Sequence, residues 1–322
     1  MKSTLDRVRD IPSREDELIL VRDLTSIGAD DRPLRRAFGA GELARLRRGV
    51  YVDRDAFTSI DDDRGYDLRI AAALATRRSD APLSHYSAAR LWGLPIVGRW
   101  PTEVHFRVPS DSGRRSASGV IVHRAEWDPL EQDEVRGTSV TTLRRTLVDL
   151  AEIAPFRDAV AAIDSALAGS RIEKEQLLRT LAPSPRAGSA RARRAIAFAR
   201  GEAASPGESF SRVLMHECGF PEPQLQARFE WDGTTRFADF WWPELGLVGE
   251  FDGRAKYFDA TLTGGRSTEQ VFWAEKLREN EFRDVGLRLV RWTWRDLVEV
   301  TPFIRRLELA GLRRTRRPLL PA

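Results

Sequence analysis

The chain has 322 residues, enough for about two domains of ordinary size, and 42% of them are hydrophobic and 31% charged. This composition excludes a mostly disordered chain, a collagen-like fibre and a coiled-coil rod, and it is typical of a globular protein. The formal net charge is only +4, yet almost all of the positive charge comes from arginine, which suits either a solvated surface or contacts to phosphate.

The expected compartment follows from features that the sequence lacks. No run of about 18 apolar residues occurs, so we expect no membrane span. The first residues contain no apolar segment of the kind found in signal peptides. Cys218 is the only cysteine and cannot form an internal disulfide. We therefore expect a cytoplasmic protein.

Residues 1–58 have the pattern of helices followed by a small β-ribbon. Apolar residues at helical spacing predict a helix over 15–27, and a second, short helix follows over 30–38. Two strands, 43–47 and 49–52, come next, with two arginines and a glycine at their turn. This order is that of a winged helix, in which a helix enters the major groove of DNA and the ribbon contacts phosphates. The alternative is a small unit that only packs on its neighbour. The arginines expected to contact DNA are Arg35, Arg36, Arg45, Arg47 and Arg48.

Residues 59–182 are expected to form a middle α+β domain. Ser84 is a suitable N-cap for a helix, and the segments 102–109 and 119–127 alternate enough to be strands. Its three histidines, His85, His105 and His123, do not have the close spacing of metal ligands, so we interpret them as structural. Proline, glycine and serine around a short Ala/Arg helix in 183–204 indicate a linker.

The segment 205–312 changes to an α-β-β-β-α-β pattern and precedes a basic tail, 313–322. The expected elements are a helix from Ser205 to about Cys218, strands at about 225–231, 235–242 and 245–252, a helix at about 268–285, a strand at 287–294 and a last helix from near Asp296.

The hairpin in this segment can be interpreted geometrically. If its turn is centred between Glu244 and Leu245, residues whose numbers sum to 489 lie opposite each other, and Asp239 faces Glu250. Their Cβ atoms would then be about 5 Å apart. Asp252 lies two residues past Glu250 and shares its face. Three carboxylates this close repel one another, so a shared proton, basic neighbours or a divalent cation must compensate their charge.

A divalent cation would give this face a catalytic role. Mg²⁺ or Mn²⁺ held by Asp239, Glu250 and Asp252 would keep waters and bind phosphate oxygens, which is the arrangement for phosphodiester hydrolysis. The alternative is a set of surface acids neutralised by nearby basic residues, for which the candidates are Arg236, Arg254 and Lys256.

Cations near the acids also have two interpretations. Lys256 follows the acidic strand closely, and Lys276 and Arg283 lie on one side of the expected long helix. They would stabilise the charged transition state at the phosphate, or else pair with acids of the same helix. Glu208 either completes a capping box with Ser205 or adds a further acid to the catalytic group.

The motifs of this segment resemble a known nuclease group. LVGEFDGRAKY, FADFWWPE, EKLRENEF and GLRLVRWTW look like the very-short-patch-repair-like branch of the PD-(D/E)XK superfamily. The resemblance implies a restriction-endonuclease-like core, Mg²⁺ dependence and DNA as substrate. By position, Asp239 matches the first acid of the motif and Glu250 the second. Asp252 stands where many members have the lysine of E-x-K, so either Lys256 or Lys276 supplies that cation from a shifted position, or hydrolysis is weakened or lost.

The first half of the chain resembles a different group. LARLRRGVYV, LSHYSAARLWGLP and VTTLRRTLVDLA are similar in sequence and order to AbiEi-type antitoxins. This resemblance implies a DNA-binding, regulator-like N-terminal half. It also implies, by analogy, a toxin–antitoxin or phage-defence context with a cognate toxin or another protein as partner.

The sequence therefore predicts a multidomain chain of α+β and α/β segments that binds double-stranded DNA. Its C-terminal domain is expected to be a Mg²⁺-dependent endonuclease. The alternative is a non-enzymatic, antitoxin-like transcriptional regulator with a degenerate nuclease fold. The expected segments are a winged helix (1–58), a middle domain (59–182), an Arg/Ala-rich linker helix (183–204), a restriction-endonuclease-like domain (205–312) and a tail (313–322).

Overall fold

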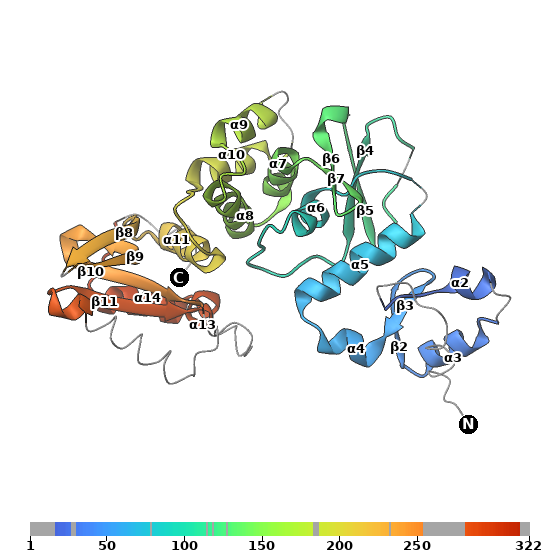
Figure 1. Cartoon of the computed structure of the whole chain (residues 1–322), viewed down its shortest axis with the longest axis horizontal. Helices are drawn as coiled ribbons and strands as arrows, with labels where there is room; N and C mark the ends of the chain where they lie inside the picture. The colour runs from blue at the N-terminus through green and yellow to red at the C-terminus, as the bar shows by residue number, and fades with distance from the viewer. Residues whose placement is uncertain are drawn as a thin grey trace. The chain divides into compact units, whose positions relative to one another are not determined.

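The computed structural model describes residues 17–26, 30–77, 79–113, 115–117, 119–126, 128–182, 187–231, 233–253 and 281–315. The chain divides into two compact units. The first comprises Met1–Leu94 and Gly98–Leu150, and the second Pro95–Val97 and Ala151–Ala322. Both units combine helices with small sheets, which confirms the α+β multidomain class (Figure 1). No helix within the described ranges is long and apolar enough to cross a membrane.

The first unit begins with a three-stranded antiparallel sheet in the order β1-β3-β2. Its elements are β1 (Ile19–Leu20), α2 (Val21–Ser26), α3 (Arg32–Gly39), β2 (Leu43–Arg47), β3 (Val50–Asp53), α4 (Arg54–Ser59) and α5 (Asp62–Thr76). The second short helix and the ribbon are confirmed. The single helix predicted over 15–27 is wrong at Ile19–Leu20, which pair with Tyr51 and Val50 of β3. Burial of Leu18 and Leu20 against β3 outweighs the helical spacing of this segment.

The remainder of the first unit contains two further strand pairs. Its elements are α6 (His85–Leu91), β4 (Val104–Pro109), β5 (Val120–Ala125), η1 (Pro129–Glu131), β6 (Gln132–Val135), β7 (Thr138–Thr141) and the start of α7 (Leu143–Ile153). β4 and β5 pair in parallel, and β6 and β7 pair antiparallel. Leu83 bridges Phe106 of β4 and Val140 of β7. The helix after Ser84 and both predicted strands are therefore confirmed.

Four charged side chains form a buried network where β4 meets α7. Arg107 Nη1 lies 3.0 Å from both carboxylate oxygens of Asp149, and Arg145 Nη2 lies 2.7 Å from Asp149 Oδ1. Glu131 Oε2 lies 3.2 Å from Arg107 Nη2, and Glu131 Oε1 lies 3.7 Å from Arg145 Nη1. Arg107, Arg145 and Asp149 are at most 3% exposed. Two positive and two negative charges thus compensate one another away from water.

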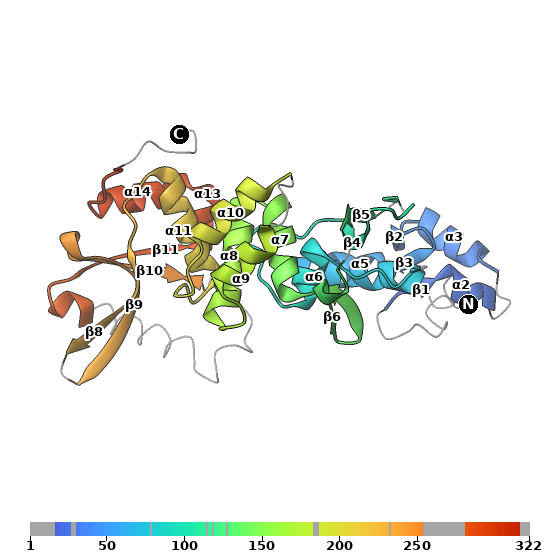
Figure 2. The same ribbon diagram turned by 90° about the horizontal axis from the view of Figure 1, so that it is seen from above.

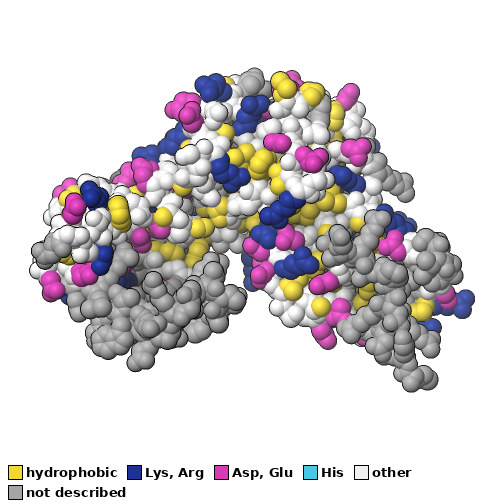
Figure 3. Space-filling view, viewed as in Figure 1, with side chains coloured by type: hydrophobic (Ala, Val, Ile, Leu, Met, Phe, Trp, Pro, Cys, Tyr) yellow, Lys and Arg dark blue, Asp and Glu magenta, His cyan; other side chains and the backbone are white. Residues whose placement is uncertain are grey.

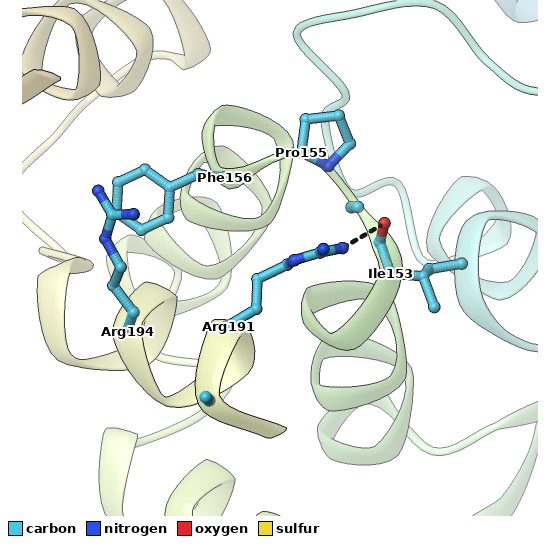
Figure 4. Close-up of a pocket in the computed structure, with 7 residues that line it drawn as sticks. Ile153, Pro155, Phe156, Arg191 and Arg194 are labelled. Carbon is cyan, nitrogen blue, oxygen red and sulfur yellow. Dashed lines mark hydrogen bonds between the residues drawn. The ribbon is translucent and has the colours of Figure 1, made fainter. Parts of the chain in front are cut away.

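The second unit starts with a helical layer: α8 (Phe156–Ala168), α9 (Lys174–Leu181), α10 (Ser189–Phe198) and α11 (Pro206–Cys218). The expected Ala/Arg helix is α10. A cavity of about 630 Å³ lies beside it, and Figure 4 shows residues that line this cavity. Arg191 donates to the carbonyl oxygen of Ile153 at 3.1 Å, and the Arg194 guanidinium carbon lies 4.2 Å from the Phe156 ring centroid. Two arginines of this basic run therefore stabilise the packing of α10.

A four-stranded mixed sheet in the order β11-β10-β9-β8 completes the second unit. Its elements are β8 (Gln224–Trp231), β9 (Thr234–Trp242), η2 (Pro243–Leu245), β10 (Leu247–Asp252), β11 (Arg288–Thr293), α13 (Trp294–Glu299) and α14 (Thr301–Leu309). β10 is antiparallel to β9 and parallel to β11. The helix predicted over 268–285 lies mostly outside the described residues, of which 281–284 are helical.

The two faces of this sheet bury different clusters. On one face, Phe240, Trp242 and Trp292 pack with Phe210 of α11 and Phe303 of α14. Figure 2 shows α11, α13 and α14 on one side of the strands. On the other face, Val248 packs with Phe282. The sheet is therefore central to this part of the second unit, and it positions the acids that the sequence singled out.

Candidate nucleic-acid interface and acidic site

Helix α3 presents arginines on its exposed face. It buries Leu34 and Ala37 against Leu43 of β2, which leaves Arg35 and Arg36 at the surface. Arg35 Nη2 pairs with Asp31 Oδ2 at 2.8 Å, and both side chains keep solvent exposure. Such an exposed pair is weak, and phosphate can replace its carboxylate.

The β2–β3 ribbon carries the other predicted arginines. Arg45 is exposed, and its guanidinium carbon lies 5.6 Å from the ring centroid of Phe38, near the end of α3. Arg47 is partly buried, which lowers its pKa through loss of solvation. Arg48 and Gly49 form the turn, and Gly49 has the positive φ of 79° that favours glycine. The ribbon is therefore coupled to α3 by the contact of Arg45 with Phe38.

Four of these five arginines lack acidic partners among the described residues. Within the part of the chain that the structure describes, no carboxylate forms an ion pair with the partly buried Arg47 or with the exposed Arg36, Arg45 and Arg48. Elsewhere the charges are mixed, since Figure 3 shows Lys and Arg side chains interspersed with Asp and Glu side chains on one face. Exposed arginines without an acidic partner among the described residues also occur elsewhere, Arg136, Arg193 and Arg305 among them. What distinguishes α3 and the ribbon is that three such arginines lie on two elements that pack on each other.

The β9–β10 hairpin has the register that the sequence predicted. Trp242 pairs with Leu247, Trp241 with Val248 and Phe240 with Gly249, so the numbers of each pair sum to 489. Asp239 and Glu250 are the next residues on the two strands. At this point Asp239 Oδ2 accepts a hydrogen bond of 2.9 Å from the backbone N–H of Phe251. Asp239 therefore lies at the end of the β9–β10 ladder, beside the strand that carries Glu250.

Glu250 has a basic neighbour on the adjacent strand. It lies opposite Arg291 in the parallel β10–β11 register. Its Oε2 accepts from Arg291 Nε at 2.9 Å and contacts Arg291 Nη2 at 2.8 Å. Glu250 is only 8% exposed, so this pair is strong and directional. Of the three forms of compensation open to the acids, a basic neighbour is the one observed at Glu250. Asp252 ends β10 and is half-buried.

Glu208 serves as a cap for α11. The Ser205 hydroxyl accepts from the Glu208 N–H at 3.2 Å and donates to Glu208 Oε1 at 2.8 Å. Glu208 Oε2 accepts from the N–H of Ala204 at 2.9 Å and from Gln226 Nε2 at 3.0 Å. The interaction with the N-cap Ser205 therefore engages one of its oxygens, and Ala204 and Gln226 engage the other.

The cations predicted beside the acids are described only in part. Lys256, Lys276 and Arg254 lie outside the described residues. Arg283 is exposed within the helical residues 281–284. Arg236, one of the candidates for neutralising the acids, instead forms a two-contact pair with Glu281 at 2.7 and 2.8 Å.

Sequence reasoning missed one cluster of side chains that could hold a metal ion. His85, His105 and His123 come from three different elements, yet each offers a ring nitrogen within 4.8 Å of the others. Their separations in the sequence carry no metal-ligand signal. The shared face of His105 and His123 depends on the parallel pairing of β4 with β5, which the sequence does not reveal.

Together these features define a multidomain α+β protein with an arginine-bearing helix-and-ribbon unit and a mixed sheet with an acidic site. No family model matches the chain. Two proteins of Mycobacterium tuberculosis, the uncharacterized proteins MT2308 and Rv2248, are each 31% identical over 216 residues, which are 66% of this chain and 74% of each relative. The chain therefore belongs to the family of these two mycobacterial proteins. The crystal structure of the RV2827C protein of the same organism is 18% identical, with a TM-score of 0.39 over 71% of this chain and 87% of that one.

Proposed function

We propose that this protein binds double-stranded DNA through α3 and the β2–β3 ribbon, and that it acts as a transcriptional regulator. The observation that carries the proposal is the set of exposed arginines on these two elements that have no acidic partner among the described residues. Helix α3 would enter the major groove, with Arg35 and Arg36 at its exposed face. Arg45 and Arg48 would contact phosphates from the ribbon.

The element order supports the same proposal. Helices α2 and α3 between β1 and the β2–β3 ribbon, with β3 in the middle of the sheet, match the layout expected of a winged helix. The packing of Leu34 and Ala37 of α3 on Leu43 of β2 holds the ribbon and α3 in a common arrangement. Such a surface contributes mainly electrostatic, salt-dependent affinity, and base contacts from α3 add sequence preference.

The test compares the wild-type chain with the triple variant Arg36→Ala, Arg45→Ala, Arg48→Ala on a duplex from the region upstream of its own gene. We expect at least about tenfold weaker binding and a salt slope of log K that falls by about 0.9 for each phosphate the variant no longer neutralises. Gel shift and fluorescence anisotropy over a salt series measure both quantities. Arg228→Ala, an exposed arginine of β8, is the matched control and should bind like the wild type. Unchanged affinity and salt slope in the triple variant would count decisively against the proposal.

A second candidate function is Mg²⁺- or Mn²⁺-dependent hydrolysis of DNA, which the β9–β10 register supports. Asp239 and Glu250 are the residues that would hold the ion, with Asp252 at the end of β10. Carboxylate oxygens are ligands that Mg²⁺ prefers, and the ion would supply an activated water. The Arg291–Glu250 pair and the hydrogen bond to Asp239 favour the regulator instead, because they already engage both acids.

Supercoiled plasmid with millimolar Mg²⁺ or Mn²⁺ distinguishes the two functions. If the acids hydrolyse DNA, the wild type nicks the plasmid and Asp239→Ala lowers the rate at least about 100-fold, since the variant has one metal ligand fewer. Asp133→Ala, an exposed acid of β6, should keep the wild-type rate. If the wild type leaves the plasmid intact with either metal, the protein does not hydrolyse DNA, and DNA binding is the function that remains.

A further inference from the structure

Three of the four histidines of the chain meet in the first unit. His85 is the first residue of α6, His105 lies on β4 and His123 lies on β5. The parallel register pairs Arg107 with His123 and His105 with Ile121, so His105 and His123 are diagonal neighbours on one face of the strand pair. Their ligand atoms and that of His85 all lie within 4.8 Å of one another.

The rings are in close contact. His105 Nδ1 lies 2.8 Å from His123 Nε2, so one of these nitrogens donates to the other. The ring of His85 stacks on that of His123 with centroids 3.6 Å apart and an interplanar angle of 20°. His85 has a φ of 49°, which is uncommon outside glycine, and its Nδ1 lies 3.0 Å from the hydroxyl of Ser84. The fold therefore holds His85 in a strained backbone position against the other two rings.

The cluster is electrically suited to a cation. Burial lowers the pKa of all three rings, that of His105 to about 3, so each is a neutral imidazole with a lone pair at neutral pH. The positive charges of Arg107 and Arg145, which face His85, are compensated by Asp149 and Glu131. His105 Nε2 is buried and has no hydrogen-bond partner among the described residues.

We propose that His85, His105 and His123 bind one divalent transition-metal ion, with Zn²⁺ as the best match, through three imidazole nitrogens. Imidazole is a preferred ligand of Zn²⁺, Ni²⁺ and Cu²⁺ rather than of Mg²⁺. Three protein ligands leave a fourth tetrahedral position for water or a small anion. Of the three residues, His85 and His105 are buried and His123 is partly exposed.

Binding changes the hydrogen bonding within the cluster. The ion replaces the His105–His123 hydrogen bond by two metal–nitrogen bonds. The ring that donates in that bond moves its proton to its other nitrogen.

The experiment uses the untagged full chain, stripped with a chelator and titrated with Co²⁺, followed by competition with Zn²⁺. We expect one ion per chain, visible d–d absorption of Co²⁺ that Zn²⁺ abolishes, and a higher Tm with Zn²⁺. His105→Gln and His123→Gln should each weaken binding by about 100-fold or more. Changing a residue that only orients a metal ligand weakens binding by about 10- to 100-fold, so a loss of this size indicates that the histidine is itself a ligand. His216→Gln, which changes the fourth histidine in α11, is the matched control and should bind like the wild type.

Two results would overturn the proposal. One is a wild-type chain that shows neither absorption nor heat with millimolar Co²⁺ or Zn²⁺. The other is binding that survives in His123→Gln. Because His123 is partly exposed, this variant should fold even if His105→Gln does not, and far-UV circular dichroism checks both. The outcome is independent of DNA binding by α3 and of any Mg²⁺ site on β9 and β10.

Discussion

Replacing Asp149 by asparagine is expected to lower the free energy of unfolding of the first unit by about 3–5 kcal/mol. Asp149 is 2% exposed and contacts both Arg107 and Arg145 at 2.7–3.0 Å. An asparagine cannot neutralise them, so two guanidinium groups would remain buried with Glu131 as their one compensating charge in the network. An uncompensated buried charge is among the most costly changes that a folded protein can undergo.

Urea unfolding followed by circular dichroism measures this loss. The matched control is Glu230→Gln in β8, which removes the acid of an ion pair with Arg228 in which both side chains are about 60% exposed. That change should cost no more than about 1 kcal/mol, because exposed pairs are screened by water. A loss below about 1 kcal/mol for Asp149→Asn would show that the network does not stabilise the unit.

The same variant should also raise the local positive charge near His85 and weaken metal binding by the histidines.

The sheet of the second unit shows what a sequence can predict. The β9–β10 register could be derived because the turn is short and its residues, Pro243 to Gly246, include typical turn formers. Once the turn is placed, the strict alternation of a strand decides which residues share a face. The cap of α11 was equally accessible, because Ser205 and Glu208 interact over a single turn of helix.

The charge partner of Glu250 could not be predicted in this way. Arg291 follows it by 41 residues, on a strand that pairs in parallel. The sequence offered Arg236, Arg254 and Lys256 because they are near in number, but Arg236 pairs with Glu281. Contacts across a parallel pair depend on the path of the intervening chain, which local patterns do not encode.

The histidine cluster had the same limitation. The strands of His105 and His123 were both predicted, yet nothing local indicated that they pair in parallel. His85 reaches the cluster through a left-handed backbone conformation, which is uncommon for any residue other than glycine and which no local pattern indicated. At Ile19–Leu20 a helical pattern likewise gave way to pairing with β3. In each case a contact between distant segments outweighed the local preference.

Replacing Arg212 by methionine is expected to destabilise the second unit by about 3–5 kcal/mol at alkaline pH. Arg212 Nη1 donates to Asp164 Oδ2 at 2.9 Å, and both side chains are at most 2% exposed. Its Nη2 also donates to the carbonyl oxygen of Phe198 at 2.9 Å. Methionine fills much of the volume but leaves Asp164 buried without its cation, with the N–H of Arg200 still donating to it at 2.6 Å.

The loss should depend on pH with a defined sign. Burial raises the pKa of Asp164 from 3.8 to about 6 in the folded wild type, even though Arg212 lowers it. A carboxyl group whose pKa is higher in the folded than in the unfolded protein stabilises the fold below its unfolded-state pKa. This stabilisation is lost as the pH rises through its folded-state pKa. Without Arg212 the folded pKa rises further. As the pH falls from the folded-state pKa of Asp164 in the variant to about 6, Asp164 becomes protonated in the variant but stays charged in the wild type. The difference between the two should therefore shrink by up to about 1.4 kcal/mol per pH unit.

Urea unfolding of the wild type and of Arg212→Met across this range measures the effect. The matched control is the double variant Asp164→Asn, Arg212→Met, in which residue 164 cannot titrate. Relative to Asp164→Asn alone, its destabilisation should stay constant over the same pH range. A constant destabilisation in Arg212→Met itself would mean that Asp164 keeps its charge in the folded variant, with the N–H of Arg200 and its other neighbours sufficient to hold it.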